Sequence, residues 1–146
     1  MPQQYAPKAA PPFVFEDRGG AQHALSDYHG HYVLLNFWAT WCSPCVHELP
    51  SLDALQARFG SRLTILPVSE NSDGDGLAAF YRAHGIAHLQ IARDPADIAP
   101  QLFHLSGVPT TILIDPQGRE TARIKGGTNW TSPAMTAFLT AWMKNP

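Results

Sequence analysis

The stretch Tyr32-Val-Leu-Leu-Asn-Phe-Trp38, followed directly by Ala39-Thr-Trp-Cys-Ser-Pro-Cys45, decides the fold of this chain. Its first seven residues are almost continuously apolar and rich in β-branched and aromatic side chains, which is typical of a central strand buried on both faces. Apolar residues then recur at three- and four-residue spacing up to Phe59, which predicts an amphipathic helix that ends at Gly60. Pro50 lies inside this helix and is expected to kink it, because proline removes one backbone hydrogen bond and crowds the preceding turn.

Cys42 and Cys45 stand where the buried strand gives way to the helix. Unpaired N–H groups and the helix dipole concentrate positive potential there, which favours the thiolate, the reactive species in disulfide exchange. Cys45 lies one turn further on and faces the same side, so it can attack a mixed disulfide on Cys42 and release the partner. Pro44 suits the first turn, where a missing N–H costs nothing, and Trp41 offers an apolar face to a partner polypeptide. The spacing therefore predicts redox chemistry.

The alternative interpretation of the Cys42-x-x-Cys45 spacing is that the two cysteines are half of a zinc site. Zinc needs two further ligands, and although His47 is close, no second cysteine pair accompanies it. His84 and His88 are separated by Gly85, which is expected to end their helix. The C-x₂-C spacing does not fit copper delivery by a C-x₃-C pair. We therefore expect no metal site. Peroxidases of the peroxiredoxin kind have threonine three residues before the reactive cysteine, and this chain has Ala39 there, so we expect no peroxidase site either.

The rest of the chain alternates between predicted strands and helices. In order, the expected elements are a hairpin over 13–24 turning at Gly19-Gly20, a helical turn capped by Ser26, the strand and helix described above, a strand over 63–69, a loop over 71–76, a helix over 77–84, a short strand over 86–92, a helix over 96–105, a strand over 111–114, a turn over 115–118, a strand over 119–124 and a helix over 132–144. Trp130, before the last helix, is expected to be a packing residue. This alternation favours an α/β fold whose sheet is partly parallel and has helices on both faces.

The composition describes one globular domain and excludes several classes of protein. The chain has 146 residues, of which 45% are apolar and 15% are charged, and its net charge is −2 without any basic run, so we expect no nucleic-acid partner. Two cysteines are too few for a disulfide-rich scaffold. Residues 1–12 hold four of the 13 prolines and predict a flexible tail outside a domain over 13–146.

The sequence is compatible with two cellular locations of the protein. Residues 1–12 lack the apolar core of a signal peptide, and no stretch of about 18 apolar residues occurs. The protein is either cytosolic, or its first residues are the remnant of a removed export signal or anchor.

These features together resemble the thioredoxin superfamily, and within it the TlpA/ResA-like branch of bacterial thiol–disulfide oxidoreductases. The stretch from Val33 to Cys45 is similar to the family's strand and active-site helix, Gly107-Val-Pro-Thr110 to its cis-proline loop, and Thr111-Ile-Leu-Ile-Asp115 to the strand after that loop. The resemblance implies a thioredoxin-like α/β fold, with a central mixed sheet flanked by helices, an N-terminal β-hairpin extension, and an extra helix and strand inserted between residues 70 and 95.

The resemblance also implies roles for individual residues. Cys42 is expected to be the nucleophile and Cys45 the resolving thiol. Pro109 is expected to be cis and to lie beside the cysteines, where the Val108 backbone would bind an extended partner segment. Trp41 and Pro44 would complete this substrate-binding surface.

Two positions depart from ordinary thioredoxin. The superfamily's buried aspartate, six residues before the first cysteine, is replaced by Asn36, which cannot exchange protons. The TlpA/ResA-like branch instead places a glutamate six residues after that cysteine, here Glu48. A partly buried carboxylate has a raised pKa and is placed to take the proton of Cys45 as that thiol attacks. The alternative is that Glu48 is a solvated first-turn acid favoured by the helix dipole.

The implied function is reduction of disulfides in partner proteins in the periplasm or another extracytoplasmic space, with electrons from a membrane thiol carrier. Cytochrome c maturation and copper-site assembly are the roles known in the family, although the chain lacks the Gly-x-x-Gly-Ala-Pro-Glu pattern of dedicated cytochrome-maturation members. We expect a monomer with no cofactor beyond its Cys42–Cys45 disulfide. Two alternatives stay open: a general cytosolic thioredoxin-type reductase, and a non-enzymatic module that binds a partner or copper through its thiols.

Overall fold

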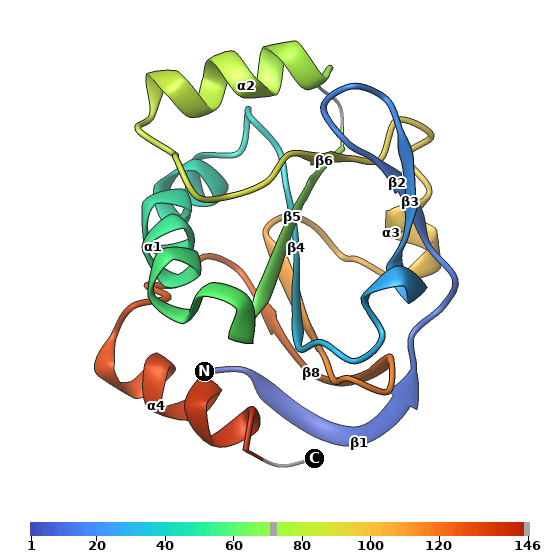
Figure 1. Cartoon of the computed structure of the whole chain (residues 1–146), viewed down its shortest axis with the longest axis vertical. Coiled ribbons are helices and arrows are strands. Elements are labelled where there is room, and N and C mark those ends of the chain that lie inside the picture. The colour runs from blue at the N-terminus through green and yellow to red at the C-terminus, as the bar shows by residue number, and fades with distance from the viewer. Residues whose placement is uncertain (71–72, 145–146) are drawn as a thin grey trace.

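The apolar run of the sequence forms β4 (Val33–Trp38), and all six of its side chains are buried. The computed structural model describes residues 1–70 and 73–144, and within them β4 lies inside an eight-stranded sheet of order β1-β8-β7-β4-β5-β6-β2-β3 (Figure 1). Pairing is parallel between β4 and β5 and between β5 and β6, and antiparallel between the other neighbours. A mixed sheet with a parallel centre is what the sequence predicts.

Apart from β1 and η2, which the sequence did not predict, the elements follow one another in the expected order. The strands and helices other than β4 are β1 (Gln3–Ala9), β2 (Val14–Glu16), β3 (Gln22–Ala24), η1 (Leu25–Tyr28), α1 (Ser43–Phe59), η2 (Gly60–Arg62), β5 (Thr64–Ser69), α2 (Gly74–Ala83), β6 (Ala92–Arg93), α3 (Ala99–Leu102), β7 (Thr110–Ile114), β8 (Arg119–Lys125) and α4 (Pro133–Trp142). The N-terminal hairpin is confirmed as β2 and β3, and the inserted helix and strand as α2 and β6. Helix α1 runs through Pro50 and ends at Gly60, as expected.

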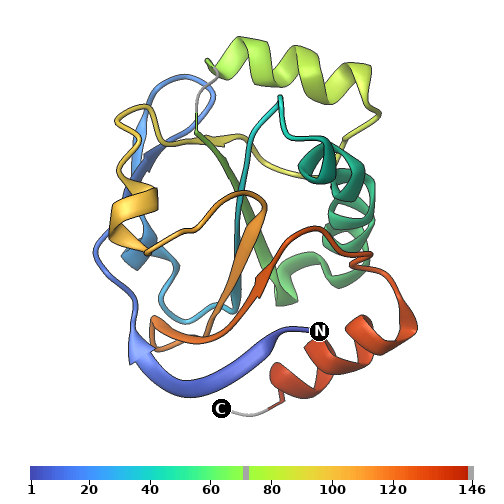
Figure 2. The ribbon, with the colours of Figure 1, turned by 180° about the vertical axis from the view of Figure 1, so that it is seen from behind.

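Helices cover both faces of the sheet (Figures 1 and 2). On one face α1, α2 and α4 share a buried cluster that includes Leu49, Leu77 and Leu139. On the other face α3 and the hairpin contribute to a second cluster, in which Phe15 and Phe103 are buried. The N-terminal end of α1 is thereby held against the carboxyl end of β4.

The first twelve residues are not a flexible tail, which corrects the sequence-based prediction. Gln3–Ala9 pairs antiparallel with β8 as the edge strand β1. Pro7 is tolerated because the register is broken between Gln4 and Lys8, and an edge strand can omit an N–H. The sheet therefore begins at Gln3, ten residues earlier than the predicted domain boundary.

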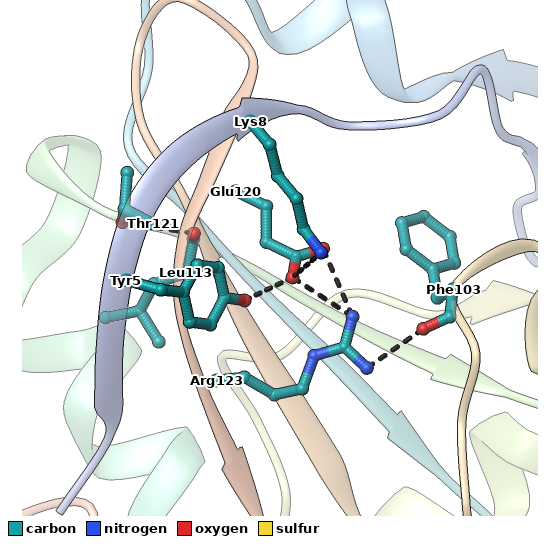
Figure 3. A network of polar contacts seen from close by, with 7 residues as sticks. All are labelled: Tyr5, Lys8, Phe103, Leu113, Glu120, Thr121 and Arg123. Carbon is teal, nitrogen blue, oxygen red and sulfur yellow. Dashed lines mark hydrogen bonds and ion pairs between the residues drawn. The ribbon is translucent and has the colours of Figure 1, made fainter.

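Side chains secure β1 to the sheet (Figure 3). The Tyr5 hydroxyl donates a hydrogen bond to the buried Glu120 of β8, and Lys8 Nζ lies 3.8 Å from the same carboxylate. Burial, reinforced by Glu120, raises the pKa of Tyr5, so this hydroxyl stays a donor. Arg123 completes the cluster: its guanidinium donates to both oxygens of Glu120 at 3.1 Å and to the Phe103 carbonyl at 2.9 Å. These contacts lie outside the reach of local sequence patterns.

The helical turn before β4 is confirmed, but Ser26 does not cap it. Ser26 lies within η1, and the Asp27 carboxylate accepts the Ala24 N–H at 3.0 Å. A carboxylate three residues into the turn reaches back to its start more readily than a serine inside it.

The middle of the chain differs from the prediction in three elements. Helix α2 begins at Gly74 because Asp73 accepts the Gly76 N–H at 2.6 Å, while residues 71–72 of the predicted loop lie outside the described part of the chain. The predicted strand over 86–92 shrinks to β6, because the Asp53 carboxylate of α1 takes the N–H groups of residues 87–89.

The third difference concerns α3, which is shorter than the predicted helix over 96–105. Its N-terminal boundary is set by Asp97, whose φ is 52°, and by the Asp94 carboxylate, which accepts the Ala99 N–H at 2.8 Å. His104, with a φ of 54°, lies just beyond its other end.

Among the described residues no helix is long and apolar enough to cross a membrane.

Candidate active site

Cys42 and Cys45 form a disulfide at the first turn of α1. Cys42 is the N-cap residue, and its Sγ accepts the Cys45 N–H at 3.3 Å. An N–H aimed at this sulfur would stabilise a thiolate there once the disulfide is reduced. Cys42 is 5% exposed and Cys45 is 0% exposed, so only Cys42 reaches the surface, beside Trp41, which is 67% exposed. This difference in access matches an attacking thiol and a resolving thiol.

The predicted cis-proline loop lies against this pair. The Val108–Pro109 peptide bond is cis, as the resemblance implies, and the Val108 carbonyl oxygen lies 3.7 Å from Cys42 Sγ. The loop is fixed from two sides: the Thr110 hydroxyl donates to the Gly107 carbonyl at 2.7 Å, and the Gly126 N–H donates to the Pro109 carbonyl at 2.8 Å. These bonds hold the half-buried Val108 beside the Cys42 sulfur.

Glu48 is buried one turn after Cys45, not solvated as the alternative interpretation has it. Its Oε1 accepts the Asn36 amide N–H at 2.9 Å, and its Oε2 accepts the Thr128 backbone N–H and the Trp130 indole N–H, each at 3.1 Å. Burial raises the pKa of Glu48 above its ordinary value, and these three hydrogen bonds, which favour the ionised form, oppose that shift. None of the donors carries a charge.

Comparison with known proteins places this geometry in a family. A model of the AhpC/TSA family matches residues 6–121. The chain belongs to the AhpC/TSA family. Thiol-disulfide oxidoreductase ResA of Geobacillus kaustophilus (strain HTA426) is 37% identical to it over 118 residues, which cover 80% of this chain and 67% of that protein.

Two solved structures resemble this member of the AhpC/TSA family along nearly all of its length. The thiol:disulfide interchange protein DsbE from Chlorobium tepidum matches with a TM-score of 0.81 at 26% identity, covering 97% of this chain and 99% of that one. The exposed lipoprotein thioredoxin from Streptococcus pneumoniae strain TIGR4 matches with a TM-score of 0.74 at 25% identity, covering 92% and 99%. The fold is thioredoxin-like, and the chain is a thiol–disulfide oxidoreductase with a Cys42–Cys45 pair.

The sequence did not reveal what holds Glu48. Trp130 is fully buried, which confirms its packing role, but its indole N–H also binds the carboxylate. The Trp130 backbone N–H donates to Ser51 Oγ at 3.0 Å, and Ser51 donates to the Glu48 carbonyl at 2.9 Å, so the segment over 126–130 is fastened to α1 at three points. Glu48 and Trp130 are 82 residues apart, and no local pattern links them.

Gly127 allows this segment to approach the active-site helix. A Cβ at Gly127 would lie 3.2 Å from the Pro44 carbonyl oxygen and 3.8 Å from Glu48 Oε2. Beside it a hollow of about 630 Å³ opens against α1, lined by Pro44, His47, Glu48 and Thr128 among others.

In the described part of this AhpC/TSA-family chain, no three His, Cys, Asp or Glu side chains come together to hold a metal ion.

Proposed function

We propose that this protein reduces disulfides of partner proteins outside the cytoplasm, with Cys42 as nucleophile and Cys45 as resolving thiol. The observation that carries the proposal is the arrangement at the start of α1, where the outer sulfur faces the cis-proline loop and the inner one is enclosed. The disulfide of the structure is then the product state of one cycle.

The proposed cycle transfers two electrons from the dithiol to the partner. The Cys42 thiolate attacks one sulfur of the partner disulfide, forming a mixed disulfide and releasing the partner's other sulfur as a thiolate that takes a proton from solvent. Cys45 then loses its proton and attacks Cys42 Sγ. The mixed disulfide breaks, the partner's second sulfur leaves as a thiolate, and the Cys42–Cys45 disulfide forms.

We assign to Glu48 the proton that Cys45 loses. Cys45 is buried and has no solvent to accept its proton, whereas Glu48 lies one helical turn away with a raised pKa. The carboxylate borders the hollow beside Gly127, which gives it an outlet to solvent.

The partner segment is expected to bind in extended form across the cis-proline loop. The Val108 backbone offers hydrogen bonds there, as a strand edge does, and Trp41 and Pro44, both exposed and next to Cys42 in the chain, offer apolar contact. This surface selects an exposed, flexible disulfide rather than one buried in a folded core.

The relatives support the extracytoplasmic site, and the resemblance to the TlpA/ResA-like branch supports the reducing direction. One structural relative is described as an exposed lipoprotein and another as a thiol:disulfide interchange protein. Electrons would then come from a membrane thiol carrier, and the partners would be disulfide-containing proteins such as apocytochrome c or proteins that assemble copper sites.

The test is reduction of insulin by dithiothreitol in the presence of the protein, with Cys42→Ser and Cys45→Ser variants. Cys42→Ser is expected to abolish turnover, and Cys45→Ser to accumulate a mixed disulfide on Cys42. Turnover retained in Cys42→Ser would remove Cys42 as the nucleophile. A wild-type rate no faster than that of dithiothreitol alone would favour a non-enzymatic binding role. A reduction potential of about −180 mV or above would contradict the reducing direction.

A further inference from the structure

In the disulfide form, one buried atom of the Asn36 side chain has no hydrogen-bond partner among the described residues. Its amide nitrogen donates two hydrogen bonds, to Glu48 Oε1 at 2.9 Å and to Thr111 Oγ1 at 2.8 Å. Its oxygen, Oδ1, is buried and accepts no hydrogen bond from any described residue. Buried acceptors are rarely left unpaired, because their desolvation is not repaid.

The placement of Asn36 points to the group that Oδ1 would serve. Asn36 lies opposite Thr111 in the antiparallel pairing of β4 with β7, and its side chain reaches the face of α1 that carries Glu48. Cys45 precedes Glu48 by three residues, so both project from the same face of that helix. Cys45 has no hydrogen on its sulfur in the disulfide, and it gains an S–H donor, fully buried, when the disulfide is reduced.

We propose that in the reduced protein the Asn36 amide bridges the two groups that exchange a proton, with Oδ1 accepting the Cys45 S–H while Nδ2 continues to hold Glu48. This inference rests on the proposed role of Glu48 and makes Asn36 a positioning residue for the resolving step. A single planar amide then fixes the thiol at one end and the carboxylate at the other.

The bridge has a chemical consequence for the order of the two attacks. A hydrogen bond to the protonated form keeps Cys45 as a thiol, so Cys42 is the thiolate that meets the partner first. Once the mixed disulfide exists, the S–H turns about the Cβ–Sγ bond from Oδ1 to Glu48. The S–H bond breaks, an O–H bond forms on the carboxylate, and the electron pair left on sulfur attacks Cys42.

Uncharged groups surround this exchange. The residues that contact the Glu48 carboxylate through hydrogen bonds are Asn36, Thr128 and Trp130, and none of them is charged. Cys45, Glu48 and Asp53 are buried titratable groups of α1, and the Asp53 carboxylate is occupied by the backbone N–H groups of residues 87–89. His47 is exposed and lines the hollow. The amide therefore acts without competition from an ion pair.

The test is the ¹³C chemical shift of the Asn36 side-chain carbonyl, measured in oxidised and reduced protein and in two variants of Cys45. Reduction is expected to move this resonance in the direction of a newly accepted hydrogen bond. Cys45→Ser keeps a donor at the same place and is expected to move it the same way. Cys45→Ala has no donor and is expected to retain the value of the oxidised protein.

An unchanged resonance on reduction, or an equal shift in Cys45→Ala, would overturn the bridge. A kinetic measurement gives a second test of the bridge: Asn36→Ala is expected to slow resolution of the mixed disulfide about tenfold. The first attack should slow less, because the Cys45 N–H still points at the Cys42 sulfur and stabilises its thiolate. Failure of the proposed function would look different, because turnover would then survive in Cys42→Ser whatever the Asn36 resonance does.

Discussion

Two buried glutamates, Glu48 and Glu120, differ in whether a positively charged side chain lies beside them. Glu48 and Glu120 are each 3% exposed and each accept several hydrogen bonds. The donors to Glu48 are neutral N–H groups, whereas Glu120 lies against Arg123 and Lys8 (Figure 3). Arg123 and Lys8 supply a counter-charge to Glu120, whereas the neutral N–H donors supply none to Glu48. The counter-charge supports a structural role for Glu120, and its absence supports the proposed role of Glu48 as a proton acceptor.

The largest expected effect comes from removing the positive charge of Arg123 beside Glu120. Arg123→Met leaves a buried carboxylate with only a partly exposed lysine as counter-charge, and is expected to lower the free energy of unfolding by about 3 kcal/mol. Denaturant unfolding at neutral pH measures this. The matched double variant Glu120→Gln/Arg123→Met removes both charges and is expected to recover most of the loss, and equal stability of the two variants would contradict the comparison.

The next largest effect is expected from Glu48→Gln and falls on the chemistry. Without a base, resolution by Cys45 should slow by about a hundredfold and lose its dependence on the Glu48 titration. Stopped-flow measurement of mixed-disulfide resolution across pH checks this. A pH profile identical to that of the wild type would exclude Glu48 from the reaction.

The same variant tests the pH dependence of stability. Because burial raises the pKa of Glu48 in the folded protein, the folded state binds this proton more tightly than the unfolded chain. The free energy of unfolding should therefore fall as pH rises from the ordinary glutamate range through the raised pKa, and level off above it. This fall should be absent in Glu48→Gln, and its persistence there would assign it to another group.

Trp130→Phe is expected to have a smaller effect that still reaches the chemistry. Losing the indole N–H removes one stabiliser of the ionised carboxylate, so the pKa of Glu48 should rise further and the resolution profile should move to higher pH. Stability should fall by about 1 kcal/mol. Trp142→Phe is the matched control, because its indole donates to Thr121 at 3.0 Å, away from Glu48. An equal shift of the profile in both variants would contradict the assignment.

Lys8→Met is expected to have the smallest effect. Lys8 is 65% exposed and its Nζ is 3.8 Å from Glu120, so the pair should contribute about 0.5 kcal/mol or less, and less still at high salt. Salt-dependent unfolding measures it. A loss comparable with that of Arg123→Met would show that the lysine, not the guanidinium, compensates Glu120.

The parts of the molecule that the sequence predicts well are those set by local pattern or by motif. The all-apolar run over 33–38 predicts β4, the spacing up to Phe59 predicts α1, and the Gly-Val-Pro loop predicts the cis bond at Pro109 through family resemblance. Glu48 was placed near Cys45 by position alone, and its burial is confirmed.

The missed features depend on partners distant in the chain. Strand β1 reads as a proline-rich tail because its register is decided by Glu120 and Arg123, more than a hundred residues away. The short β6 follows from Asp53, a carboxylate on α1 that no pattern connects to the backbone 34 residues later. Trp130 carries no sign of its second role, because a buried tryptophan before a helix is ordinarily explained by packing alone.

The segment over 126–130 has a consequence for how this enzyme can be altered. One end of it donates to the Pro109 carbonyl in the partner-binding loop, and the other end donates twice to Glu48. Under the proposed function, partner binding and proton transfer share this short segment, so a substitution there is expected to alter both the choice of partner and the pH optimum. Trp41, whose side chain is exposed and makes none of the contacts to Glu48, offers a position where the two traits can be separated.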